Sequence, residues 1–203
     1  MDYYMNENNV VTRLVEEWKE HSKLIIAYDF DSTVFDYNTK GYKYDDVIEL
    51  LQECNGLGAY YVCFTSCNED RYKFIKDFLQ ENMIPCDKIN ENIDIIPFTG
   101  RKIYYNILLD DRSGLKSAYD CLRKALGTIY LEKIIEIYKR KSSNKKNIQF
   151  ALSLLSKFKL NAVLEILDER LEKLYRRDLI FNSSKQIEML ENIIEYIIEV
   201  RNQ

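Results

Sequence analysis

Residues that several common chemistries require are scarce in this chain of 203 residues, which has one histidine, two prolines and six glycines. Any Ser-His-Asp or Cys-His mechanism would have to use the single ring of His21, which we interpret instead as a surface residue at the end of a helix. So few prolines and glycines exclude collagen-like and proline-rich low-complexity sequence.

Long apolar runs and paired cysteines are also missing. No apolar run approaches about 18 residues, so we expect no transmembrane helix, and the polar, acidic segment 1–9 does not resemble a secretory signal. The five cysteines are odd in number and show no paired short spacing, which argues against a disulfide framework or a zinc site and favours a reducing compartment. We therefore expect a cytoplasmic protein with no membrane partner.

The composition is sufficient for a folded core, because 46% of the residues are hydrophobic and 13% are aromatic. The net charge of −4 conceals an asymmetry. Residues 1–115 carry 12 basic and 21 acidic side chains, whereas residues 116–203 carry 17 basic and 12 acidic ones. This difference indicates two regions with different tasks, which we place at 1–115 and 116–203.

Apolar patterning in the first region predicts alternating strands and helices. Helices are expected over Val10–His21, Tyr44–Cys54 and a segment from Asn68 or Glu69 to Glu81, with Asn8 or Asn9 capping the first. Buried strands are expected over Leu24–Asp29, Ala59–Phe64 and Tyr104–Asp110, with a short extended piece at Ile93–Pro97. The alternation predicts an α/β fold with a Rossmann-like open parallel sheet.

The second region is expected to be an all-helical extension. Glycine and proline nearly vanish after Leu115, and a polar basic linker is expected at Lys139–Lys146. Apolar periodicity predicts these helices: one or two over Leu115–Lys141, then Asn147–Lys157, Asn161–Arg177 and Ser184–Arg201.

The strongest chemical signal follows the first strand, as Asp29-x-Asp31-x-Thr33. Carboxylates two residues apart in an extended segment can face the same way. One can then bind a metal and attack as a nucleophile, while the other donates and accepts a proton. The alternative interpretation is a pair of turn or capping aspartates.

Three further elements stand near the ends of later segments. Thr65-Ser66 offers hydroxyl and backbone N–H groups at a helix start, although Ser and Thr also cap helices generally. Lys102 can pair with a phosphate. The adjacent carboxylates of Asp110 and Asp111 repel each other unless a cation such as Mg²⁺ relieves them, although a solvated Asp-Asp turn is the alternative.

Taken in order, these elements resemble the four motifs of the HAD superfamily of phosphatases over roughly residues 23–115. Asp29-x-Asp31-x-Thr33 resembles the first motif, Thr65 the second, Lys102 the third and Asp110-Asp111 the fourth. Small uncapped members found in phages and bacteria resemble the chain in the stretch from Gly100 to Arg112 and in Asn90-Glu91-Asn92 before it. We therefore expect the protein to act in a bacterial or phage-infected host cell. The chain departs from the family at Ser32, where many members have glycine or asparagine, and in its long helical tail.

The resemblance implies a role for each motif. Asp29 attacks phosphorus and forms an aspartyl-phosphate, while Asp31 protonates the leaving oxygen and then activates water. Thr65 and Lys102 hold the transferring phosphoryl group.

The resemblance also implies a Mg²⁺ cofactor. Its ligands are Asp29, the backbone carbonyl of Asp31 and the side chain of Asp111, with Asp110 ligating or supporting it. Only 31 residues separate Thr33 from Thr65. An interval of 36 residues separates Thr65 from Lys102, so we expect no cap domain and an open site.

Three functions are compatible with these residues. The first is a Mg²⁺-dependent phosphomonoester hydrolase acting on a small phosphorylated metabolite or nucleotide. The second is a phosphatase that processes nucleic-acid ends, which we do not favour because lysine-rich helices with interspersed glutamate are ordinary solvated faces. The third is a catalytically idle HAD-like module whose helical tail binds a protein partner.

Overall fold

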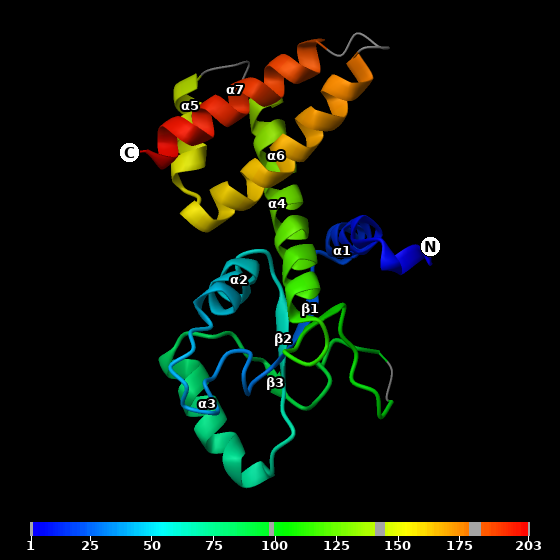
Figure 1. The fold of residues 1–203 in the computed structure, drawn as a ribbon, viewed down its shortest axis with the longest axis vertical. Helices are drawn as coiled ribbons and strands as arrows, with labels where there is room; N and C mark the ends of the chain where they lie inside the picture. The colour runs from blue at the N-terminus through cyan, green and yellow to red at the C-terminus, as the bar shows by residue number, and fades with distance from the viewer. Residues whose placement is uncertain (1, 98–99, 141–144, 179–183, 203) are drawn as a thin grey trace. The chain divides into compact units, whose positions relative to one another are not determined.

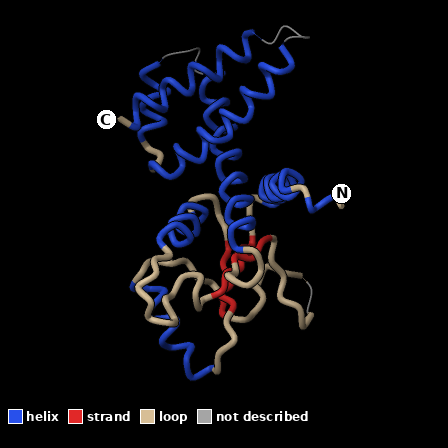
Figure 2. Tube along the Cα trace, viewed as in Figure 1, coloured by secondary structure: helices blue, strands red, loops and turns tan. Residues whose placement is uncertain are grey.

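The computed structural model describes residues 2–97, 100–140, 145–178 and 184–202. In these ranges the chain is an α/β protein with one four-stranded parallel sheet and seven α-helices (Figure 1). It divides into two compact units, Met1–Leu122 and Arg123–Gln203. Strands occur in the first unit, whereas the described part of the second is almost entirely helical (Figure 2). None of the described helices is long and apolar enough to cross a bilayer.

The first unit contains the expected alternation of helices and strands. Its elements in chain order are α1 (Glu7–His21), β1 (Ile25–Asp29), α2 (Asp45–Asn55), β2 (Tyr60–Phe64), α3 (Tyr72–Glu81), β3 (Lys88–Ile89) and β4 (Ile107–Leu109). A single 3-10 turn, η2 (Glu69–Arg71), precedes α3.

The cap of α1 differs from the expected Asn8 or Asn9: the side chain of Asn6 accepts the N–H of Asn8 at 3.0 Å. Two predictions of extended structure also need correction. The short extended piece expected at Ile93–Pro97 is interrupted by a turn at residues 94–95, and β4 is shorter than the expected strand.

The sheet order is β3-β2-β1-β4, with every pairing parallel. The chain moves outward from β1 to β3 and then returns to the other side of β1, as in Rossmann-like folds. The reversal of direction makes the carboxyl ends of β1 and β4 a topological switch point, where open α/β sheets bind ligands. Register pairs Tyr28 with Leu109 and Asp29 with Phe64, so the residues after β4 and β2 emerge beside Asp29.

The two faces of the sheet are covered differently. Ile25 and Ala27 of β1 and Val62 of β2 form a buried cluster with Ile93. The partly buried members of this cluster include three more residues of the connection between β3 and β4, which are Ile96, Ile103 and Tyr105. Loop residues therefore cover this face. On the other face, the buried hydroxyl of Tyr61 donates to the backbone carbonyl of Leu51 in α2 at 2.7 Å.

Asn106 ties α1 to the sheet just before β4. Its side-chain oxygen accepts the N–H of Ile25 at 2.7 Å, and its amide donates to Glu17 of α1 at 2.8 Å. Arg13 of α1 donates to the backbone carbonyl of Asn106 at 3.0 Å. These bonds fix the start of β4 against β1. They thereby determine where the residues at the carboxyl end of β4 lie relative to the end of β1.

The second unit is formed by helices with apolar stripes. Its helices are α4 (Leu115–Arg140), α5 (Lys145–Ser153), α6 (Lys157–Asp178) and α7 (Ser184–Arg201), and α7 packs on both α5 and α6. A single helix fills the segment for which one or two were expected, and residues 141–144 of the expected linker lie outside the described residues. α4 begins in the first unit, where Ser117 donates to the carboxylate of Glu7 at 2.7 Å. This contact explains why the first unit extends past residue 115.

Gly127 of α4 lies close against the backbone of α6. A Cβ built there would lie 2.5 Å from the carbonyl oxygen of Ala162. Alanine in place of glycine ordinarily stabilises a helix by about 0.5–1 kcal/mol, but here it must displace backbone, and overpacking costs about 1–3 kcal/mol.

We expect Gly127→Ala to lower the free energy of unfolding by about 1–2 kcal/mol in urea denaturation. The exposed Glu136→Ala of the same helix should change it by less than about 0.5 kcal/mol. A Gly127→Ala protein as stable as wild type would contradict the close approach.

Candidate functional site

Asp29 is the last residue of β1 and lies at the switch point of the sheet. It is half-buried, and the pKa of its carboxyl is raised from 3.8 to about 6, chiefly by burial. The carboxylate of Asp110, which directly follows β4, is the next largest cause of this increase, and the charges of Asp111 and Asp31 act in the same direction. Three carboxylates from two loops therefore share the electrostatic environment of Asp29, as expected from their positions at strand ends.

The turn after β1 is tightly held. Ser32 has a positive φ of 63°, and its N–H donates to the carbonyl of Phe35 at 2.8 Å. Thr33 is fully buried, and its Oγ1 accepts the N–H of Asp111 at 3.2 Å. The threonine of the motif therefore joins the turn after β1 to the residues after β4, a role that the sequence alone did not indicate.

Asp31 forms a two-pronged ion pair with Arg71, a residue that the sequence analysis did not single out. Nη1 of Arg71 lies 2.7 Å from Oδ2 of Asp31, and Nη2 lies 2.8 Å from Oδ1. Both side chains are partly exposed. Because the two residues are 40 positions apart, only the fold brings the last residue of η2 to the motif that follows β1.

Thr65 follows β2 and is buried. Its Oγ1 has no hydrogen-bond partner among the described residues. Its backbone is held by Asn90, which follows β3: the Asn90 side chain accepts the N–H of Thr65 at 3.0 Å and donates to its carbonyl at 2.7 Å. The same side-chain amide donates to the hydroxyl of Tyr72 at 3.1 Å. Asn90 itself has a φ of 53°, a left-handed conformation that asparagine tolerates. The Thr65 backbone is thus fixed, while its hydroxyl is buried without a partner among the described residues.

Lys102 is exposed. It makes no hydrogen bond or ion pair with any residue in the ranges that the structure describes. It lines a hollow of about 350 Å³ together with Tyr104 and Tyr105. Tyr105 packs edge-on against Phe64 with ring centroids 5.7 Å apart, and Phe64 pairs with Asp29 in the sheet. Lys102 therefore belongs to the loop that covers the sheet face from which Asp29 emerges.

The oxygen donors at the switch point are chemically suited to Mg²⁺. Asp110 uses Oδ1 to accept the N–H of Arg112 at 2.7 Å, and Asp111 is exposed. No group of three His, Cys, Asp or Glu side chains within the described residues is arranged to hold a metal ion. Mg²⁺ commonly uses one or two carboxylates together with water and phosphate oxygens. Burial and the neighbouring carboxylates both raise the pKa of Asp29, and such a cation would relieve the negative charge of these carboxylates.

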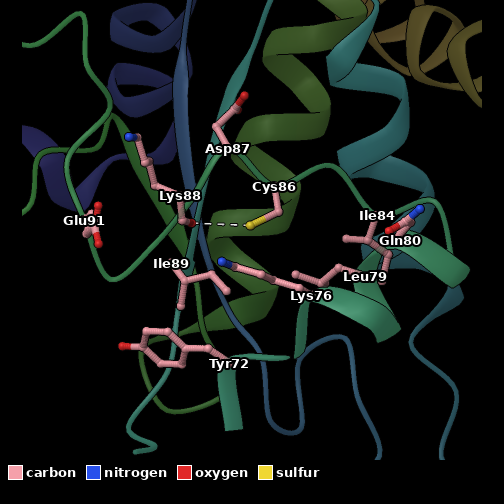
Figure 3. Close-up of a pocket in the computed structure, with 10 residues that line it drawn as sticks. All are labelled: Tyr72, Lys76, Leu79, Gln80, Ile84, Cys86, Asp87, Lys88, Ile89 and Glu91. Atoms are coloured by element: carbon pink, nitrogen blue, oxygen red, sulfur yellow. Dashed lines mark hydrogen bonds between the residues drawn. The ribbon is translucent and has the colours of Figure 1, made fainter. Parts of the chain in front are cut away.

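A separate pocket of about 510 Å³ lies between α3 and β3 (Figure 3). Cys86, Lys88 and Lys76 are among the residues that line it, and the Cys86 thiol lies 3.4 Å from the carbonyl of Lys88. None of the residues predicted for catalysis or metal binding lines this pocket. Tyr72, which also lines this pocket, accepts a hydrogen bond from Asn90.

Comparison of the chain with protein-family models, with curated proteins and with solved structures finds no match.

The raised pKa of Asp29 has a consequence for stability. Because the pKa in the folded protein exceeds 3.8, the folded state binds more protons than the unfolded chain between about pH 4 and pH 6. The contribution of this carboxyl to stability therefore falls as the pH rises through that window. We expect Asp29→Asn to raise the Tm in EDTA at pH 7.5 by more than it does at pH 4.5.

The matched control is Asp46→Asn, which alters an exposed carboxylate in the first turn of α2. Its effect on Tm should differ little between the two pH values. An Asp29→Asn protein that is less stable than wild type at pH 7.5 would show that the charge on Asp29 is compensated in the fold.

Proposed function

We propose that the protein is a Mg²⁺-dependent phosphomonoester hydrolase of the HAD type, without a cap domain, acting through an aspartyl-phosphate on a small phosphorylated metabolite or nucleotide. The observation that carries this proposal is the half-buried Asp29 carboxyl at the switch point, crowded by the carboxylates of Asp110 and Asp111. Such a group favours a hard divalent cation, and that cation retains affinity for phosphate oxygens.

Asp29 is the nucleophile in this reaction. A bound Mg²⁺ would neutralise negative charge on the carboxylates and on the phosphoryl oxygens. The bond from an Asp29 oxygen to phosphorus forms while the bond from phosphorus to the leaving oxygen breaks. The buried hydroxyl of Thr65 supports this assignment, because it is a donor with no partner among the described residues and its backbone is fixed by Asn90.

Asp31 is assigned the proton transfers. It gives a proton to the leaving oxygen and later takes one from the water that hydrolyses the aspartyl-phosphate. Both of its oxygens accept hydrogen bonds from Arg71. One of those bonds opens when Asp31 carries a proton, whereas the intact pair suits the second half-reaction, in which ionised Asp31 is the base.

Lys102 is assigned to the phosphoryl group from its chemistry and its place in the chain. It is an exposed amine on the loop that covers the Asp29 face of the sheet. A lysine on that loop can reach a phosphoryl oxygen without disturbing an existing ion pair within the described residues.

The decisive experiment measures release of inorganic phosphate from a panel of phosphate monoesters, with and without Mg²⁺. We expect Mg²⁺-stimulated turnover that falls by about a thousandfold or more in Asp29→Asn, because that change removes the nucleophile. The exposed Asp46→Asn should behave as wild type does.

The two other functions give different outcomes. Turnover confined to phosphorylated oligonucleotides, with strong dependence on salt, would identify a nucleic-acid end-processing enzyme. No Mg²⁺-stimulated turnover across the panel would reject the hydrolase and favour an idle module that binds a partner.

A further inference from the structure

We propose that Tyr37 and Phe74, placed beside Asp31 by Arg71, form the surface that binds the leaving group, and that this group carries a planar aromatic ring, as in a nucleoside monophosphate. The inference rests on the proposed function and narrows its substrate class.

Arg71 is the centre of this surface. Its guanidinium is anchored to both oxygens of Asp31 and lies 5.2 Å from the ring centroid of Tyr37 and 5.9 Å from that of Phe74. The same guanidinium also lies within 6 Å of two further rings, those of Phe30 at 5.7 Å and Phe35 at 5.9 Å. Such cation–π contacts, added to the ion pair, hold Arg71 in one orientation.

Arg71 contacts a set of aromatic rings that are packed tightly on one another. Phe30 is fully buried and stacks on Phe35 with centroids 5.1 Å apart, and Phe78 of α3 meets Phe35 edge-on at 5.1 Å. The segment that carries Tyr37 is also fixed, because the N–H of Tyr37 donates to the carbonyl of Phe35 at 2.9 Å. The surface is therefore preorganised before any substrate binds.

Tyr37 and Phe74 differ from these packed rings because they remain in contact with solvent. Tyr37 is 57% exposed and Phe74 is 45% exposed. They come from different segments, the loop after β1 and the first half of α3, and both contact the same guanidinium. Two exposed rings that contact the same fixed cation make a surface suited to a flat π system.

The proposed reaction brings the leaving group to this surface. As the bond between Asp29 and phosphorus forms, the bond between phosphorus and the leaving oxygen breaks, and the proton from Asp31 moves to that oxygen to give the free alcohol. The alcohol therefore starts next to Asp31, and Arg71 is bonded to Asp31. A nucleoside gains stacking contacts there that a sugar or polyol alone lacks.

Two substrates with the same leaving oxygen test the inference. Adenosine 5′-monophosphate and ribose 5-phosphate both release a primary ribose hydroxyl, but only the first carries a base. We expect wild-type kcat/KM to favour the nucleotide by about tenfold or more, chiefly through KM, as stacking on aromatic side chains predicts. Tyr37→Ala and Phe74→Ala should each reduce that preference severalfold, whereas Tyr37→Phe should keep it. Tyr42→Ala, which removes a 67% exposed tyrosine from the same loop, is the control and should also keep it.

Binding to the Asp29→Asn protein, measured by calorimetry with Mg²⁺, separates this inference from the proposed reaction. Tighter binding of the nucleotide that is lost in Asp29→Asn/Tyr37→Ala supports the surface even if wild type turns over neither compound, in which case the reaction alone is rejected. Equal binding and equal kcat/KM for the two compounds, or a preference unchanged in Tyr37→Ala, would overturn the inference. Circular dichroism of each variant shows whether it is folded.

Discussion

The crowding of carboxylates at the carboxyl edge of β1 and β4 is the constraint on which the rest of the site depends. Parallel pairing between these strands places Asp29 and Asp110 side by side, and burial prevents water from screening their charges fully. The fold maintains this arrangement through contacts beneath it. Thr33 links the two loops, and Asn106 sets the start of β4. A protein without a use for the charge would gain stability by losing it, which is why we propose that this edge holds a cation and an anionic ligand.

The surrounding residues divide the site into two sides. Asn90 fixes the backbone of Thr65 on the side of β2 and β3, where a phosphoryl group would be held. Arg71 fixes Asp31 on the side of α3, where the leaving group would depart. The residues assigned to these two sides all belong to the first unit, and the second unit has its own core of helices. The chemistry proposed for the chain is thus contained in the first unit.

The sequence predicted the parts of the fold that local patterns encode. Continuous apolar runs revealed β1 and β2, and helical periodicity revealed α2 and α7 almost to their ends. It did not reveal β3, because two residues are too short to show a period. The Arg71–Asp31 pair joins residues 40 positions apart and leaves no local signal, so only the three-dimensional structure shows it. The predicted carboxylates do share an environment, whereas the contact expected for Lys102 remains a prediction.

The loop over the Asp29 face of the sheet differs from the helices in how it is held in place and in how its backbone groups are hydrogen-bonded. It is anchored by apolar burial, as at Ile93, and by isolated hydrogen bonds such as that from the N–H of Tyr104 to the side chain of Asn92 at 2.8 Å. A helix can open only by breaking a cooperative ladder, but a cover of this kind can detach piecemeal. Amide hydrogens along it should therefore exchange with deuterium before those of β1 and β2. Lys102 stands on this early-opening segment, so the energetics of local unfolding would govern when its charge reaches the sheet edge.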